Sequence, residues 1–168
     1  LVLALPVLLL AAGPAPAIDI ADKVEVAAGP EKVWAVIGDF CGIKAWHPAV
    51  EDCALSRKDG KAVRTLTLKG GGRLVEEQAS RDEKVMSYSY ARLEGPLPVI
   101  DYTATLLAAP SGAGSTVHWN GSFNPKGVHE PLATETVARL HAAGLKRIAD
   151  RARADRPRSL LHTMTAPP

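Results

Sequence analysis

The side chains that could do chemistry in this sequence are a few histidines and tyrosines set among apolar residues. His141 lies inside a run of apolar residues spaced three and four apart, where a titratable ring is unexpected. Tyr88 and Tyr90 alternate with serines, and Tyr102 follows in a later apolar segment. If these groups converge on one bound molecule, they can exchange protons with it. A core residue with its own hydrogen bonds satisfied is the competing interpretation for each of them.

Catalytic and metal-binding motifs of known mechanism are absent from the sequence. It contains no Gly-x-Ser-x-Gly elbow and no phosphate-binding Gly-Lys loop, and His129-Glu130 lacks the second histidine of a zinc protease motif. Gly70-Gly71-Gly72 leads into no helix that could bind an anion, so it predicts a hairpin turn. We therefore predict no cofactor, no metal and no catalytic residue, and treat an enzyme as the alternative.

Two cysteines, Cys41 and Cys53, lie twelve positions apart and flank the segment Trp46-His47-Pro48. In an oxidising compartment they are expected to pair, and the bond would hold that segment between them. The alternative is a metal site formed with His47. Zinc ligands usually occur as close pairs of cysteines, which this chain lacks, so we predict the disulfide.

The amino-terminal segment has the pattern of a secretory signal. Residues 1–10 are apolar and uncharged, and Ala15-Pro16-Ala17 has the small-x-small form of a cleavage site. The apolar run is shorter than the about 20 residues that span a bilayer. We predict a signal peptide over residues 1–17 with a truncated n-region, no stable membrane insertion after its cleavage, and a periplasmic or secreted protein. A buried first strand or helix is the alternative, which the prolines of this segment disfavour.

Composition excludes several other classes of protein. The chain has 168 residues, of which 46% are hydrophobic and 23% charged, as in an ordinary globular domain. Twenty Lys and Arg against eighteen Asp and Glu leave a formal charge of +2. No segment concentrates the basic residues needed to follow a phosphate backbone, so nucleic acid is not an expected partner.

Hydrophobic periodicity predicts the elements that position these residues. Alternation over 22–28 predicts a strand, Gly29-Pro30-Glu31 predicts a helix start, and Gly42 to Trp46 allow a short second helix that Pro48 ends. From Val50 to Phe123 the period is two, and turn signals divide this region into six strands. Those signals are Asp59-Gly60, Gly70-Gly71-Gly72, Arg81-Asp82-Glu83-Lys84, Gly95-Pro96 and Ser111-Gly112-Ala113-Gly114.

The period returns to 3.6 over residues 132–153, which predicts one long carboxy-terminal helix. Its apolar stripe consists of Val137, Leu140, His141, Gly144, Leu145, Ile148 and Ala152. Short turns between consecutive strands favour an antiparallel meander. The predicted fold is α+β, with a seven-stranded antiparallel sheet in the order β-α-α-β6-α packed around the long helix. The domain is expected over residues 18–155, and a flexible tail over 156–168.

This order of elements resembles the SRPBCC or START-like superfamily, which includes polyketide cyclases, lipid-transfer domains and pollen allergens. The similarity extends over roughly residues 20–155. It rests on Gly29-Pro30-Glu31-Lys32-Val33-Trp34, Asp39-Phe40, Trp46-His47-Pro48-Ala49-Val50, Glu94-Gly95-Pro96-Leu97-Pro98-Val99 with Tyr102, and Thr116-Val117-His118-Trp119 with Phe123. The resemblance implies a helix-grip fold with a cavity between sheet and long helix, and the two short helices at one mouth.

The residues expected to face that cavity follow from periodicity. Val117, Trp119, Gly121 and Phe123 share one face of the last strand, which its apolar content predicts to be the inner one. Met86, Tyr88 and Tyr90 likewise share a face. The predicted cavity residues are Trp34, Ile37, Phe40, Trp46, His47, Tyr88, Tyr90, Tyr102, Trp119, Phe123, His141 and Leu145.

Three functions are compatible with this pattern, because members of one fold differ widely in what they do. The leading hypothesis is an exported carrier of a small hydrophobic molecule or lipid. The first alternative is a polyketide cyclase-like enzyme that uses acid-base residues of the cavity. The second alternative is an accessory protein that docks to an exported partner enzyme, since some exported relatives resemble helpers of periplasmic methanol oxidation.

Overall fold

The structure is a computed structural model, and it describes residues 16–154. The predicted signal peptide over residues 1–17 therefore lies almost entirely outside the described residues, and so does the predicted tail over 156–168.

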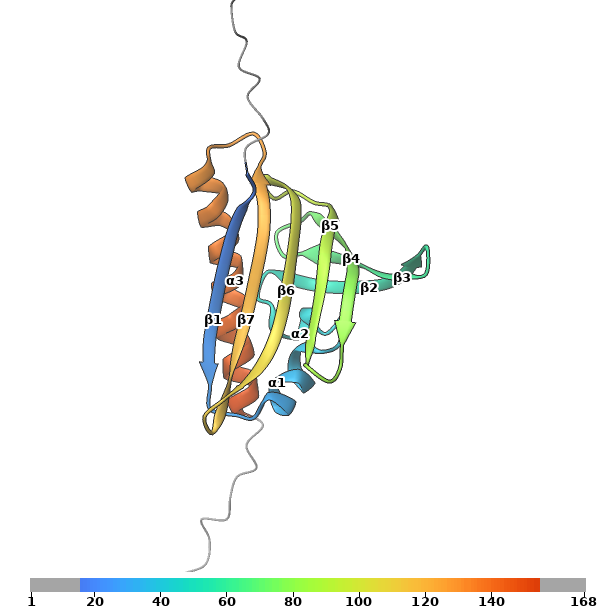
Figure 1. The fold of residues 1–168 in the computed structure, drawn as a ribbon. Coiled ribbons are helices and arrows are strands. Elements are labelled where there is room, and N and C mark those ends of the chain that lie inside the picture. Colours follow the sequence, from blue (N-terminus) through green and yellow to red (C-terminus); the bar gives the residue numbers. More distant parts are fainter. Residues whose placement is uncertain (1–15, 155–168) are drawn as a thin grey trace, which may run out of the picture.

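A single antiparallel sheet of seven strands forms the framework (Figure 1). Its strands are β1 (Ile18–Val26), β2 (Val50–Lys58), β3 (Lys61–Leu68), β4 (Arg73–Asp82), β5 (Ser87–Glu94), β6 (Val99–Ser111) and β7 (Gly114–Pro125). The spatial order is β1-β7-β6-β5-β4-β3-β2, so the first strand pairs with the last and the others follow as a meander. This arrangement confirms the predicted fold class.

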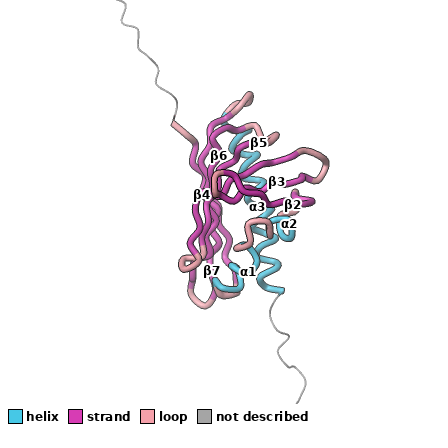
Figure 2. The backbone as a smooth tube through the Cα atoms, turned by 90° about the vertical axis from the view of Figure 1, so that its right-hand side faces the viewer, coloured by secondary structure: helices cyan, strands magenta, loops and turns pink. Residues whose placement is uncertain are grey.

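Three helices accompany the sheet: α1 (Pro30–Ile37), α2 (Ile43–Trp46) and α3 (Glu130–Ala154). The long helix α3 runs beside β1 and β7 and contacts both short helices, as Figures 1 and 2 show from two sides. Val137, His141 and Ile148 are among its buried residues, whereas Arg139 and Lys146 are exposed. The predicted amphipathic stripe is therefore the face that packs on the sheet.

Two hairpins show how local sequence determines the register. Asp59 and Gly60 both have positive φ, at 50° and 80°, as a two-residue hairpin between β2 and β3 requires. The turn between β4 and β5 lies later than the sequence predicts, at residues 83–86. The Asp82 carboxylate accepts the backbone N–H of Lys84 at 2.8 Å, which closes the turn after Asp82. Met86 consequently belongs to the turn rather than to β5.

The first strand is displaced relative to its prediction. It covers Ile18–Val26 rather than 22–28, because its ladder with β7 begins at the pair Ile18 and Phe123. The inner face of β7 is as predicted: Val117, Trp119 and Phe123 are buried, and Asn120 is exposed. Alternation along β7 therefore predicted its buried face correctly. The apolar pattern of β1 did not predict where that strand begins.

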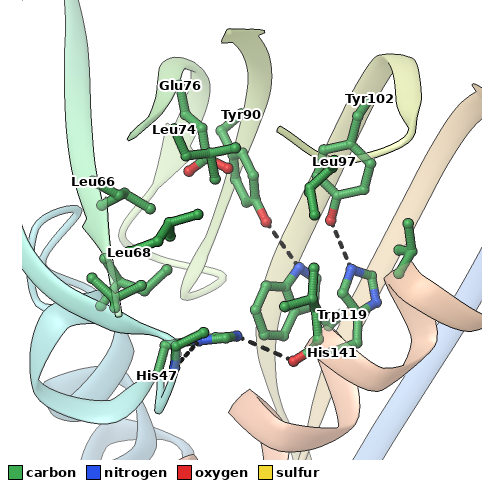
Figure 3. A pocket seen from close by; sticks show the side chains of 15 residues that line it. His47, Leu66, Leu68, Leu74, Glu76, Tyr90, Leu97, Tyr102, Trp119 and His141 are labelled. Atoms are coloured by element: carbon green, nitrogen blue, oxygen red, sulfur yellow. Dashed lines mark hydrogen bonds between the residues drawn. The ribbon is translucent and has the colours of Figure 1, made fainter. Parts of the chain in front are cut away.

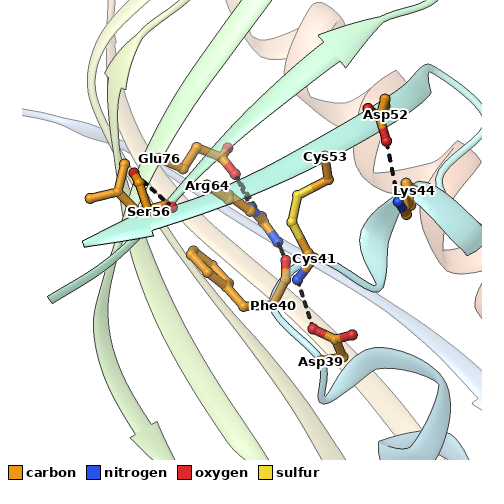
Figure 4. The surroundings of a disulfide bond; sticks show 10 residues. Asp39, Phe40, Cys41, Lys44, Asp52, Cys53, Ser56, Arg64 and Glu76 are labelled. Atoms are coloured by element: carbon orange, nitrogen blue, oxygen red, sulfur yellow. Dashed lines mark hydrogen bonds and ion pairs between the residues drawn. A yellow bond between two sulfur atoms is a disulfide. The ribbon is translucent and has the colours of Figure 1, made fainter.

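A disulfide joins Cys41 to Cys53, with Cα atoms 5.6 Å apart (Figure 4). It connects the segment between α1 and α2 to the edge strand β2, and it uses both sulfurs that the alternative metal site would need. The backbone N–H of Cys41 also donates to the Asp39 carboxylate at 2.9 Å.

Removal of this disulfide is expected to destabilise the protein. A Cys41→Ser/Cys53→Ser variant should lose about 3 kcal/mol of unfolding free energy, because the unfolded chain gains the entropy of an open loop. Urea unfolding of the oxidised wild type, the reduced wild type and the variant measures this loss. If reduction leaves the unfolding midpoint unchanged, the bond does not form in the folded protein.

Candidate functional site

A cavity of about 80 Å³ lies between the sheet and α3 (Figure 3). It is lined by Ile43, His47, Ala49, Val50, Leu66, Leu68, Leu74, Glu76, Tyr90, Leu97, Tyr102, Trp119, Val137, Leu140 and His141. Most of this lining is aliphatic or aromatic. Of the two short helices only α2 contributes a lining residue, and α1 contributes none.

The lining is unevenly buried, which indicates where the cavity approaches solvent. Leu66 and Val137 are almost fully buried, whereas Ala49, Leu68, Leu97 and Leu140 are half-buried. The half-buried members come from the end of β3, from the loop between α2 and β2, from the loop before β6, and from α3. We therefore place the mouth of the cavity on this side.

One end of the cavity carries a chain of hydrogen bonds that starts on the edge strand β1. Asp22 of β1 accepts a hydrogen bond from Nδ1 of His141 at 2.9 Å, and Nε2 of that ring lies 2.7 Å from the Tyr102 hydroxyl. Because an ionised carboxylate can only accept, the His141 proton is assigned to Nδ1. Nε2 of the neutral ring is then an acceptor, and the Tyr102 hydroxyl donates to it.

A second tyrosine and a tryptophan complete this end of the cavity. The indole N–H of Trp119 donates to the Tyr90 hydroxyl at 3.0 Å. The Trp119 ring stacks on His141, with ring centres 4.5 Å apart and an angle of 12° between the planes. Figure 3 shows both hydroxyls pointing from the strands toward the Trp119 and His141 rings.

Burial keeps these groups uncharged. It raises the pKa of Tyr90 well above its usual value, and the nearby Tyr102 oxygen adds to that shift. Burial likewise raises the pKa of Tyr102. It lowers the pKa of His141, although the hydrogen bond to Asp22 acts in the opposite direction. At neutral pH the two tyrosine hydroxyls and the His141 ring are therefore neutral hydrogen-bonding groups.

His47 faces the cavity from the segment after α2, and both of its ring nitrogens are occupied. Nε2 lies 3.1 Å from the carbonyl oxygen of Leu140, to which it donates, and Nδ1 accepts the backbone N–H of Ala49 at 3.2 Å. Burial lowers the pKa of His47 to about 4. Gly144 allows α3 to approach this segment, since a Cβ there would lie 2.9 Å from the His47 ring and 2.5 Å from Trp119.

A buried ion pair lies beside the cavity. Arg64 of β3 is fully buried, and its Nε donates to the Glu76 carboxylate at 2.6 Å, while another guanidinium nitrogen donates to the Phe40 carbonyl at 2.6 Å (Figure 4). The guanidinium carbon also lies 4.2 Å from the centre of the Phe40 ring. Burial by itself would lower the pKa of Arg64, but the Glu76 charge raises it above its usual range.

The structure divides the predicted cavity residues into two groups. His47, Tyr90, Tyr102, Trp119 and His141 line the cavity. The others pack outside the lining, in the core or at its edge: Trp34, Ile37, Phe40, Trp46, Tyr88, Phe123 and Leu145. Trp34 is only half-buried, and its indole N–H donates to Glu83 at 2.8 Å. Periodicity identifies a buried face, but it does not identify which buried residues border an empty space.

Three functional candidates escaped the sequence prediction: Asp22, Arg64 and Glu76. The sequence contained a signal for the ion pair. Arg64 lies two residues from Leu66, and Glu76 two residues from Leu74, so each lies on the same face of its strand as a leucine of the core. Charged residues at inward positions of two neighbouring strands predict a buried pair. No comparable signal existed for Asp22, whose partner His141 comes from the other end of the chain.

Comparisons with known proteins agree with this geometry. The family model of polyketide cyclases/dehydrases and lipid transport proteins matches residues 17–153. The solved structure of the protein XoxI from Bacillus cereus is 27% identical, with a TM-score of 0.74 over 79% of this chain and 93% of that one.

More distant structures share the fold alone. The Zhui aromatase/cyclase from Streptomyces sp. R1128 has a TM-score of 0.70 at 18% identity, over 82% of this chain and 94% of that one. Ara h 8.0201 has a TM-score of 0.70 at 15% identity, over 83% of this chain and 99% of that one.

The fold is a helix-grip fold, and together with the family match it defines a protein of the SRPBCC superfamily. Within that class, the chain belongs to the polyketide cyclase/dehydrase and lipid transport family. Among residues 16–154, no helix is long and apolar enough to cross a membrane. In the same part of the chain, no three His, Cys, Asp or Glu side chains gather as metal ligands would.

Proposed function

We propose that this protein is an exported carrier that holds a small hydrophobic molecule in the cavity between the sheet and α3. The observation that carries the proposal is the lining: most of its side chains are aliphatic or aromatic, and only a few polar groups are set among them. Such a distribution is typical of sites in which apolar contacts supply affinity and a few polar groups orient the ligand.

The size of the cavity limits the ligand. About 80 Å³ is well below the roughly 300–1,000 Å³ of pockets that take drug-sized molecules. A small ring or a short chain is therefore the size of molecule that this cavity favours. Native mass spectrometry of the protein purified from its host, followed by extraction and identification of any retained molecule, tests the carrier directly. A protein that retains nothing and binds no added lipophile would contradict it.

A bulkier side chain at the mouth is expected to block binding. Leu97→Trp places an indole at the half-buried rim, so we expect affinity for a small aromatic such as phenol to fall at least tenfold without loss of folding. The matched control is Leu93→Trp, because Leu93 is 46% exposed and does not line the cavity. Calorimetric titration measures both variants. If both bind as the wild type does, ligand enters elsewhere.

The proposal also states where the protein acts, which is outside the cytosol. The disulfide between Cys41 and Cys53 supports an oxidising compartment, because such bonds are rare in the cytosol. Fractionation of the host, with the disulfide state measured by thiol labelling, tests periplasmic or secreted localisation. Docking to an exported enzyme stays a prediction, and copurification of a stoichiometric partner would support it.

A cyclase-like enzyme is the second candidate, and the observation that favours it is the chain Asp22–His141–Tyr102. A tyrosine whose proton is shared with a carboxylate-oriented histidine can act as a general base toward a bound molecule. The small cavity argues against a long polyketide substrate. Conversion of a linear poly-β-ketone by the protein, abolished by Tyr102→Phe, would favour the enzyme over the carrier.

A further inference from the structure

The hydrogen bonds at the polar end of the cavity all run in one direction. Trp119 donates to the Tyr90 hydroxyl, and His141 donates to the Asp22 carboxylate. Between them the Tyr102 hydroxyl donates to Nε2 of His141. The direction originates at Asp22: its carboxylate fixes the tautomer of His141, and that tautomer makes Tyr102 the donor.

The Tyr102 oxygen is therefore left with lone pairs only. Its hydrogen is committed to His141, so toward any other group it can only accept. The Tyr90 hydroxyl already accepts from Trp119, and the nearby Tyr102 oxygen is available to take its hydrogen. With that bond made, neither tyrosine has a hydrogen left to offer to a ligand.

The remaining polar side chains of the lining supply no donor either. The Glu76 carboxylate accepts from the Arg64 guanidinium, and a carboxylate paired with a guanidinium has only acceptor oxygens to offer. His47 uses its one N–H on the Leu140 carbonyl, and Trp119 uses its N–H on Tyr90. No polar side chain that lines the cavity therefore has a free hydrogen to donate, and the lone pairs that stay open are those of the tyrosine oxygens and the Glu76 carboxylate.

We infer that the cavity selects a ligand whose polar group is a hydrogen-bond donor: a small apolar molecule with an O–H or N–H, such as an alcohol, a phenol or an amine. An acceptor-only group such as a ketone or ether finds oxygen lone pairs opposite its own. A buried acceptor without a donor loses its bond to water and gains nothing in return. The inference rests on the proposed binding function and adds the chemical class of the ligand.

Three compounds with the same ring test the inference: cyclohexanol, cyclohexanone and methylcyclohexane. Calorimetric titration of the purified protein at neutral pH should show cyclohexanol binding about fivefold more tightly than cyclohexanone, the worth of one net hydrogen bond. Methylcyclohexane measures the contribution of the ring without a polar group.

Tyr90→Phe provides the sharper measurement. Loss of this hydroxyl frees the Trp119 N–H, which then becomes a donor at the polar end of the cavity. The order of affinities should reverse, with cyclohexanone binding more tightly than cyclohexanol. The matched control is Tyr88→Phe, because Tyr88 is a buried tyrosine of the same strand that does not line the cavity. It should keep the wild-type order.

The outcomes separate this inference from the proposed function. If the wild type binds alcohol and ketone equally well, the selection for a donor is wrong, whereas the binding function stands. The same holds if Tyr90→Phe leaves the order unchanged in a variant that unfolds at the wild-type temperature. If none of the three compounds binds, the proposed function fails and the inference fails with it.

Discussion

Glu76→Gln is expected to destabilise the protein by about 3–5 kcal/mol, the largest effect of any single substitution considered for this chain. The amide keeps the shape of the carboxylate but removes the charge that compensates Arg64. The guanidinium is fully buried, and its other neighbours, the Phe40 carbonyl and the Phe40 and Tyr90 rings, carry no net charge. Taking an uncompensated cation out of water is what makes the substitution costly.

A neighbouring ion pair supplies the control. Glu77, the next residue in β4, pairs with Lys61 at 2.7 Å, and the Lys61 side chain is 56% exposed. Glu77→Gln should therefore cost no more than about 1 kcal/mol. Urea unfolding at neutral pH compares the two variants. A double variant, Arg64→Met/Glu76→Leu, is expected to recover most of the loss. If Glu76→Gln costs as little as Glu77→Gln, the Arg64 charge is compensated in another way.

Acid is expected to destabilise the protein through His47. Its pKa is about 4 in the folded chain, against an ordinary value of 6.5. Between these values the unfolded chain binds more protons, so stability decreases as the pH falls from 6.5 toward 4. The total approaches about 3 kcal/mol below pH 4. The main reason is burial of the ring, which disfavours its charged form. A proton on Nδ1 would in addition face the Ala49 N–H that this nitrogen now accepts.

The test compares the pH dependence of unfolding rather than stability at one pH. His47→Asn loses the bond to Leu140 and should be less stable at pH 7, but its decline between pH 7 and 4 should be smaller by about 3 kcal/mol. His118→Asn, on the half-exposed side of β7, should decline as the wild type does. A His47→Asn profile as steep as that of the wild type would assign the acid sensitivity to other groups, among them His141.

Much of the fold could be predicted because its signals are local. The alternation of Val117, Trp119 and Phe123 identified the inner face of β7, and Asp59-Gly60 identified a hairpin. The errors were local as well. The turn after β4 lies later than predicted because the Asp82 side chain closes it, and propensity alone does not register that hydrogen bond.

The candidate site was only partly predictable, because it depends on contacts between distant segments. The sequence pattern singled out His141, Tyr90 and Tyr102, since polar rings within apolar faces stand out. Asp22 did not stand out, because a charged residue on an edge strand is ordinary. Its importance comes from a contact with His141, 119 positions later in the chain.

The sequence by itself determined the order of the elements and the buried faces of β7 and α3, and it favoured the pairing of its only two cysteines, because period, turn residues and cysteine count are properties of the chain. The tertiary structure decided which buried residues border a cavity, how large that cavity is, and in which direction its hydrogen bonds run. Those properties depend on the packing of α3 against the sheet to within an ångström, and hence on side chains brought together from both ends of the chain.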